Sequence, residues 1–354
     1  MIRSLFSAVS GLTAHQEAMD VIGNNIANID TVGFKSSSVD FSEAFAQTTR
    51  VADDSTPIGL EVGLGTRVVG TTTNFSQGAL QRTDVPSDIA ISGNGFFIVN
   101  TLNPSSVSSS TGNTYLTRAG DFVVDVNGYL RTPDGFYVQG YSTDSSINTA
   151  TATISTALNE TVGGGNGSGF GTVYLDASGN VVTAGTAGAQ SAVAGDYVAD
   201  LPPTAGITTP ASTLTSIKIP HSIVTGTTAG GAPYTTEAVT NYSIGTGGAI
   251  TAVGADGTSV VIGYIPLATV TNQAGMSTVG SGYYQPTQAS GQPNVTQATT
   301  GTSGTLQSGA LELSNADVAD QFSEMIIIQN GYNANAKVIT TSSQMLSVAV
   351  NMIQ

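Results

Sequence analysis

Apolar side chains recur at helical spacing near the end of the chain. Between residues 314 and 354 they follow one another in steps of four and three, with Gln329 and Ser343 as the polar exceptions. This spacing is typical of a helix that packs along a coiled-coil-like seam, and Ser314 with Asp317 predicts its start. At about 1.5 Å per residue the helix would be roughly 60 Å long, longer than the core of an ordinary domain. We therefore expect other copies of the chain to cover its seam residues Phe322, Met325, Tyr332, Ile339, Leu346 and Val350.

A second amphipathic helix is predicted for residues 1–30, where apolar residues lie three or four apart except around His15 and Gln16. We expect residues 1–30 and 314–354 to pair as one terminal helical assembly domain, exposed in the monomer and buried in a homopolymer. The simpler alternative is that both helices close one large core within a single chain. The residues expected to face a partner are Leu5, Val9, Leu12, Ile22 and Ile26.

Between the two helices the pattern changes to that of β structure. Residues 31–70 mix scattered aromatic residues with Ser, Thr and Gly, and they predict an extended connector. Short apolar runs around Asn127-Gly128 and Asp256-Gly257 predict antiparallel hairpins, so we expect one β domain built from residues 71–143 and 241–313. Residues 144–240 are rich in Ala, Thr, Ser and Gly and predict an inserted outer β domain. The expected fold class is mainly β with long terminal α-helices and discontinuous, nested domains.

Composition narrows the possible partners. Nine basic against 24 acidic residues give a formal charge of −15, which disfavours nucleic acid and anionic membrane surfaces. No apolar stretch approaches the roughly 20 residues of a membrane span, so no membrane insertion is expected. The chain has no cysteine, which excludes disulfides and thiolate sites. The first helix lacks a continuous apolar core and a cleavage site, so residence in the cytosol or export without a cleaved signal both stay open.

Little in the sequence indicates catalysis. The glycine clusters lack the spacing of phosphate-binding and dinucleotide-binding loops, and His15 and His221 are the only histidines, so no cofactor and no metal site are expected. Asp53 and Asp54 lack the alternating oxygen ligands of a calcium loop. We therefore expect a protein that is not an enzyme. The alternative from another class is a secreted carbohydrate-binding or hydrolytic protein that acts through residues 144–240. The carboxylates close enough in sequence to form acid and base pairs are Asp84 with Asp88 and Asp121 with Asp125.

Several motifs stand at both ends of the chain and in the β region: residues 7–12 (SAVSGL), 19–28 (MDVIGNNIAN), 31–35 (TVGFK), 88–97 (DIAISGNGFF), 115–120 (YLTRAG) and 308–317 (SGALELSNAD). These motifs resemble those of the rod and hook proteins of the bacterial flagellum. The resemblance covers about residues 1–141 and 265–354 and leaves the middle unmatched. One departure is Asn330, where the family usually carries arginine after the glutamine.

The resemblance implies a subunit of a hollow tube, with the terminal helices forming its wall and the β domains outside. Because rod proteins tend to be shorter, the inserted middle favours a subunit of the flagellar hook, the curved and flexible joint that transmits motor torque, over a distal rod subunit. The resemblance also implies an extracellular location on the basal body and export without a cleaved signal peptide. The implied partners are many copies of the chain, the distal rod protein, the hook cap, the hook-filament junction proteins and the flagellar export apparatus.

Overall fold

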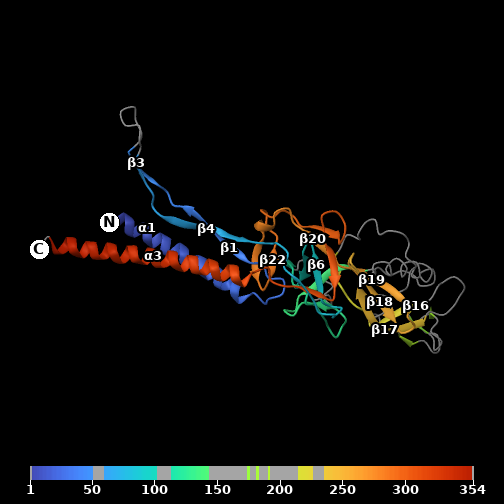
Figure 1. Cartoon of the computed structure of the whole chain (residues 1–354). Coiled ribbons are helices and arrows are strands. Elements are labelled where there is room, and N and C mark those ends of the chain that lie inside the picture. Colours follow the sequence, from blue (N-terminus) through green and yellow to red (C-terminus); the bar gives the residue numbers. More distant parts are fainter. Residues whose placement is uncertain are drawn as a thin grey trace. The chain divides into compact units, whose positions relative to one another are not determined.

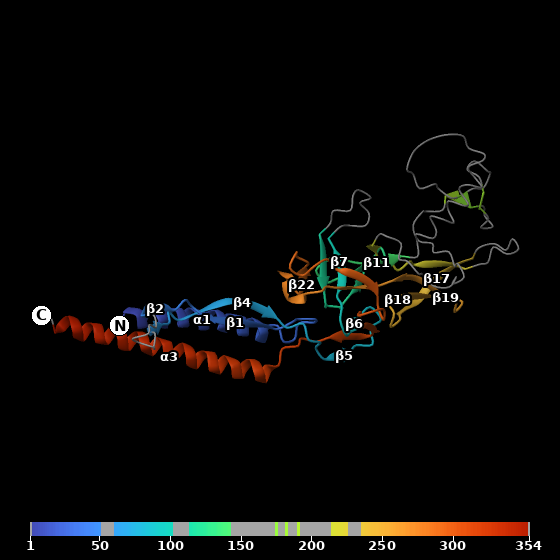
Figure 2. The same ribbon diagram turned by 90° about the horizontal axis from the view of Figure 1, so that it is seen from above.

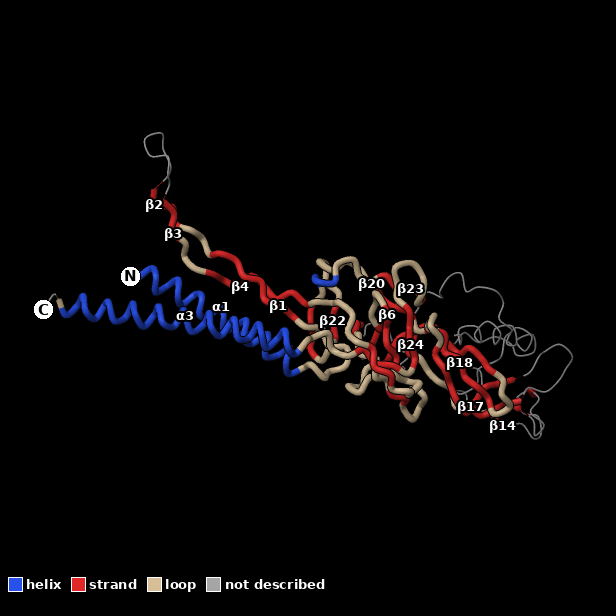
Figure 3. The backbone as a smooth tube through the Cα atoms, in the orientation of Figure 1, coloured by secondary structure: helices blue, strands red, loops and turns tan. Residues whose placement is uncertain are grey.

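The computed structural model describes residues 2–50, 60–101, 113–142, 174–175, 181–182, 190–191, 214–225 and 235–352. The chain divides into two compact units (Figure 1). Residues 1–79 and 313–354 form one, called here the helical unit, and residues 80–312 form the other, called the β unit. Strands make up most of the described chain between the two long helices (Figure 3), so the fold is mainly β with terminal helices, as predicted.

The helical unit is built on α1 (Ile2–Ala27) and α3 (Val318–Asn351). The two helices lie side by side and run in opposite directions, so that the N- and C-termini lie at the same end (Figures 1 and 2). Helix α3 begins four residues later than predicted, because the Asp317 carboxylate accepts hydrogen bonds from the backbone N–H groups of Ala319 and Asp320 and so caps the helix there. Neither helix in the described part of the chain is long and apolar enough to cross a membrane.

The sequence predicted an extended connector over residues 31–70, and the structure has paired strands in this part of the chain. Strand β1 (Ser37–Glu43) pairs antiparallel with β4 (Thr66–Thr73), and β2 (Gln47–Arg50) pairs with β3 (Leu60–Val62). This ribbon lies along α1, where the ring centroid of Phe41 is 5.9 Å from that of His15. A two-stranded ribbon is marginal by itself, so packing on the helix supplies the burial that its Ser- and Thr-rich sequence lacks.

The β unit is organised around an antiparallel sheet of twelve strands. Both predicted hairpins are confirmed: Gly128 and Gly257 each have a φ of +84°, which glycine adopts without strain, in the turns after β9 and β18. The main strand order is β16 (Ser222–Thr225), β17 (Thr235–Ile244), β18 (Ala249–Gly254), β19 (Ser259–Tyr264), β11 (Tyr137–Ser142), β7 (Phe97–Asn100), β8 (Thr114–Thr117), β22 (Tyr283–Gln285), β21 (Ser277–Gly280). Beside it β11 pairs with β15 (Thr215–Ser216) and with β10 (Leu130–Arg131), which pairs with β9 (Val123–Val124).

Smaller ribbons complete the β unit. They are β5 (Leu80–Arg82) with β25 (Ala310–Glu312), β6 (Ile89–Ser92) with β24 (Thr305–Ser308), and β20 (Pro266–Thr269) with β23 (Asn294–Gln297), together with the 3-10 turn η1 (Gln273–Gly275). A separate small sheet has the order β13 (Val181–Val182), β12 (Tyr174–Leu175), β14 (Gln190–Ser191). Strands β7, β8 and β11 share one sheet with β19 and β22, so the chain before and after the middle region builds one core.

The expected boundary at residue 240 falls inside β17, which pairs with β18 of the main sheet. Val239 and Tyr242 both pack against the core, on either side of a register shift between Val239 and Asn241, so the strand continues through the boundary that composition alone had suggested. Most of residues 144–213 lies outside the described chain, and an inserted outer domain there stays a prediction.

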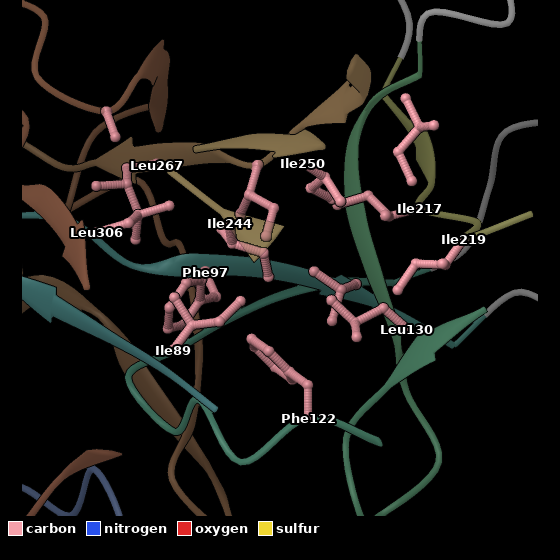
Figure 4. Close-up of a cluster of buried hydrophobic side chains, with 14 of the residues drawn as sticks. Ile89, Phe97, Phe122, Leu130, Ile217, Ile219, Ile244, Ile250, Leu267 and Leu306 are labelled. Carbon is pink, nitrogen blue, oxygen red and sulfur yellow. The ribbon is translucent and has the colours of Figure 1, made fainter. Parts of the chain in front are cut away.

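Two phenylalanine rings lie in the hydrophobic core of the β unit (Figure 4). The rings of Phe97 and Phe122 meet edge to face, with centroids 5.0 Å apart, and Ile89, Leu130 and Ile250 close around them without exposed surface. Each fully buried side chain of this size contributes about 1.5–3 kcal/mol. The β unit therefore has a core of its own.

Candidate assembly interface

The face of α1 that packs on α3 consists mainly of small residues. The buried positions step by three or four along the helix: Ala8, Gly11, Ala14, Ala18, Ile22 and Asn25. A Cβ atom added to Gly11 would lie 2.6 Å from Asn335 Nδ2, and one added to Gly331 of α3 would lie 2.7 Å from His15 Nε2. The two glycines thus let side chains of the opposite helix approach the backbone closely.

Replacing Gly331 by valine should force the helices apart. We expect Gly331→Val to lower the free energy of unfolding of the helical unit by about 1–3 kcal/mol, the usual cost of overpacking. Gly23→Val is the matched control, because nothing lies within 4 Å of a Cβ atom at Gly23, and it should change stability by less than about 0.5 kcal/mol. Thermal unfolding followed by the helical circular dichroism signal measures both, and equal effects would contradict the close approach.

The structure divides the predicted seam residues into three groups. Ile22, Ile26 and Met325 join a small cluster with Ala18 and Ile328 inside the helical unit. Leu5, Leu12, Tyr332 and Ile339 are half-buried, whereas Val9, Phe322, Leu346 and Val350 are exposed. Along α3 the inward positions are Gln321, Met325, Ile328, Tyr332, Asn335, Ile339 and Ser342.

The predicted seam therefore coincides only in part with the contact inside one chain. Small and amide side chains face inward and allow close packing, and several larger apolar side chains are left outside. A sequence pattern that counts only large apolar residues overlooks this choice.

An outward apolar set of side chains remains on the two helices. Ile326 and Ile327 were not predicted, although the run Ile326-Ile327-Ile328 contained the signal: successive helical residues point about 100° apart, so three cannot share one face. Ile327 is 68% exposed and Phe322 is 49% exposed. The outward apolar set comprises Phe6, Val9, Val318, Phe322, Ile326, Ile327, Val338, Met345, Leu346, Val348, Val350 and Met352.

The last turns of α3 extend beyond α1. His15 lies opposite Gly331, and Gly11 lies opposite Asn335, so in this antiparallel register Ile2 lies opposite about Gln344. Residues after that position have no partner on α1, which leaves the side chains of Met345, Val348 and Met352 exposed. An unpaired apolar helix end of this kind is a common feature of interaction surfaces.

One buried amide joins α1, α3 and the ribbon. The Asn25 side chain is 2% exposed. Its Nδ2 donates to the Ser37 carbonyl oxygen at 2.7 Å and to Gln321 Oε1 at 2.8 Å, and its Oδ1 accepts from the Ser37 backbone N–H at 3.0 Å. In the sequence Asn25 stands out only as a member of the motif of residues 19–28, whereas in the structure it is a buried connection between three elements.

Removing that amide should loosen the helical unit. Asn25→Ala leaves the backbone groups of Ser37 without their partner, so we expect it to lose about 1–3 kcal/mol of stability. The neighbouring Asn24 is exposed and makes one long side-chain contact with Asn28, and Asn24→Ala should change stability by less than about 0.5 kcal/mol. Urea unfolding of the two variants compares them, and a cost for Asn24→Ala as large as that for Asn25→Ala would refute the assigned role.

Other motif residues also have structural partners within the helical unit. Asn315 Oδ1 accepts from the Ser36 backbone N–H at 2.8 Å, and its Nδ2 donates to the Asn74 carbonyl oxygen at 2.7 Å. The ammonium group of Lys35, which is also buried, donates to the Ser76 carbonyl oxygen at 2.7 Å. These hydrogen bonds connect the segment that follows α1 and the segment that precedes α3 with each other and with residues 74–76.

The candidate catalytic carboxylates do not pair as their spacing suggested. Asp84 forms an exposed ion pair with Arg82 at 2.5 Å, and Asp125 forms a half-buried ion pair with Arg131 at 3.2 Å. Asp88 and Asp121 instead lie opposite each other in a β-bridge. Burial raises the pKa of Asp121, and the nearby carboxylates of Asp88 and Asp134 add to the rise.

Metal ligation finds no support in the described chain. No group of three or more His, Asp or Glu residues within it is placed to hold a metal ion. His15 belongs to the helical unit and His221 to the β unit. Asp53 and Asp54 lie outside the described residues.

Comparison with known proteins identifies the family. Three family models match: flagella basal body rod protein over residues 5–35, the flagellar hook protein FlgE/F/G D1 domain over residues 90–163, and the C-terminal part of flagellar basal body rod FlgEFG proteins over residues 307–352. The chain is 32% identical to the flagellar basal-body rod protein FlgG of Bacillus subtilis, over 99% of each chain.

Hook proteins are similar to the same extent. The chain is 30% identical to the flagellar hook protein FlgE of Salmonella typhimurium, over 99% of this chain and 100% of that protein. It is also 46% identical to the hook protein FlgE of Helicobacter mustelae over 42% of this chain and 32% of that protein. The chain therefore belongs to the family of bacterial flagellar rod and hook proteins, and it is a structural subunit of that kind.

Proposed function

We propose that this chain is the subunit of the flagellar hook, assembling with many copies of itself into a hollow, curved and flexible tube that transmits motor torque to the filament. The observation that carries the proposal is the outward apolar set on α1 and α3, which a single chain leaves in water. Burial of such apolar surface is favourable by about 25 cal/mol per Å², so it would stabilise the association of copies. Of the predicted interface residues, Val9, Phe322, Leu346 and Val350 belong to this set, and Leu5, Leu12, Tyr332 and Ile339 are half-buried. Ile22, Ile26 and Met325 instead pack inside the helical unit. The proposed contacts between copies are therefore made by the exposed and half-buried members, to which we add Ile326 and Ile327.

The proposed role is mechanical and contains no catalytic step. Its partners would be other copies of the chain, the distal rod protein below, the hook cap during growth and the hook-filament junction proteins above. We further propose that the flagellar export apparatus delivers the chain to an extracellular position on the basal body without a cleaved signal peptide. The absence of cysteine suits passage through that route in an unfolded form, since no disulfide has to be broken.

The distal rod subunit is the second candidate. It is favoured by the 32% identity to a rod protein over 99% of both chains. Both candidates use the same helices for assembly, so the fold does not separate them.

Electron microscopy of polymers grown from the purified full chain separates the two candidates. Curved tubes that change curvature under flow would support the hook, and straight, stiff tubes would support the rod. A chain that stays monomeric at all concentrations, alone and with a hook cap protein added, would overturn both.

A further inference from the structure

An open hollow in the β unit is lined by aromatic rings and one carboxylate. Its volume is about 300 Å³, at the lower end of the range for ligand pockets. That size suits a small molecule or a single side chain rather than a nucleotide or an oligosaccharide. The lining residues are Tyr115, Asp134, Phe136, Val279, Gly280, Ser281 and Tyr283.

The three rings hold one another in place. Phe136 lies between the other two, with its centroid 5.7 Å from that of Tyr115 and 4.7 Å from that of Tyr283, and both pairs meet edge to face. Tyr283 is almost fully buried, so the hollow has a firm wall. The opposite rim is the turn between β21 and β22, where Ser281 adopts the left-handed φ of +49°.

The carboxylate of the hollow is oriented by the buried phenol. The Tyr283 hydroxyl donates to Asp134 Oδ2 at 2.9 Å and lies 3.0 Å from Thr132 Oγ1. Asp134 is exposed, and it forms no ion pair with any Lys or Arg of the described residues. Its second oxygen is therefore available to a ligand.

The charges near the hollow are mainly negative. Asp134 and Asp88 both contribute to the raised pKa of the buried carboxyl of Asp121. Arg131 lies close in space to the turn that contains Asp134: its guanidinium donates to the Gly135 carbonyl oxygen at 3.1 Å, pairs with Asp125 and lies over the Tyr137 ring. Its charge is directed to those partners, and an anionic ligand would meet unfavourable potential at Asp134.

We propose that this hollow binds a small organic cation, a guanidinium or alkylammonium group. Aromatic rings attract such cations through their electron-rich faces, and a carboxylate adds a directed charge-assisted hydrogen bond. Val279 and the rings accommodate the alkyl part, and the free oxygen of Asp134 receives the N–H donors.

Titration of the full chain with methylguanidinium tests the proposal. With the tyrosine rings isotope-labelled, the signals of Tyr115 and Tyr283 should shift and saturate, whereas N-methylurea, a neutral isostere, should leave them unchanged. Asp134→Asn should weaken binding about tenfold or more, since it removes the charge from an exposed position. Asp256→Asn, at an exposed turn elsewhere in the β unit, is the control and should bind as the natural chain does.

Three results would overturn the proposal: no saturable shift up to the solubility of the probe, equal binding of the neutral isostere, or unchanged affinity in Asp134→Asn. The titration above uses the single chain and does not depend on the proposed polymer. A second titration, of the polymer itself, identifies the source of the cation and does rest on the proposed function. If the polymer no longer binds the probe, a side chain of a neighbouring copy occupies the hollow; if the polymer still binds it, the ligand is a free amine or guanidine.

Discussion

Replacing Ile326 and Ile327 together by serine should abolish polymerisation of the chain at concentrations where the natural chain forms tubes. Both side chains are mostly exposed in the single subunit, so the variant loses contacts only where another copy would cover them. Fully burying two isoleucines is favourable by about 3–6 kcal/mol, and each 1.4 kcal/mol corresponds to about a tenfold change in affinity. The critical concentration for assembly should therefore rise at least about a hundredfold.

The single subunit provides the internal control for this variant. Neither side chain is in the contact between α1 and α3, so the variant should keep the helical content of the natural chain. Its free energy of unfolding, followed by thermal unfolding, should change by no more than about 0.5 kcal/mol, the usual range for surface changes. Val126→Ser, which removes an exposed apolar side chain from the β unit, is the matched control for lost surface hydrophobicity. Sedimentation of the three chains gives the result, and normal assembly of the double variant would contradict the proposed interface.

Replacing Arg118 by alanine should destabilise the β unit strongly, because it breaks a buried ion pair. Arg118 Nη1 lies 3.3 Å from Glu312 Oε2, and the two side chains are 2% and 0% exposed. The guanidinium also donates to the Gly93 carbonyl oxygen at 2.8 Å and lies over the Phe96 ring. Burial lowers the pKa of Arg118, with Glu312 opposing that effect, so each charge depends on its partner. Removing one partner of a buried pair costs about 3–5 kcal/mol.

An exposed ion pair of the same type provides the control. Arg82 and Asp84 pair at the surface, where such pairs contribute about 0–1 kcal/mol, so Arg82→Ala should have little effect. Combining Arg118→Met with Glu312→Leu removes both charges and should recover most of the loss. Urea unfolding followed by tyrosine fluorescence compares the four chains. Equal costs for Arg118→Ala and Arg82→Ala would show that the buried pair does not hold the fold.

Local sequence patterns predicted the elements whose stability is local. Helices at both ends follow from apolar residues at helical spacing, and the turns at Gly128 and Gly257 follow from the backbone freedom of glycine. The ribbon of residues 37–73 was missed because its support comes from α1, to which no sequence pattern in the ribbon itself points.

Features that depend on distant partners could not be predicted. Arg118 and Glu312 are 194 residues apart, and Asn25 contacts α3 across 296 residues. In the helices, the sequence showed that apolar faces exist. It did not show which face packs inside the chain, because Gly11 and Gly331 favour close approach over the burial of larger side chains such as Phe322.

The central claim is that the outward apolar set of α1 and α3 becomes buried between copies of the chain. The chain has no cysteine, so Ile326→Cys introduces a unique thiol, and Val126→Cys does the same at an exposed site of the β unit. The rate of maleimide labelling of each variant is compared between the dilute subunit and the polymer. We expect the labelling rate at Ile326→Cys to fall at least about tenfold on assembly, because burial should stabilise the covered state of that site by more than about 1.4 kcal/mol. The labelling rate at Val126→Cys should persist. Polymers in which Ile326→Cys labels as fast as in the free subunit would contradict the claim.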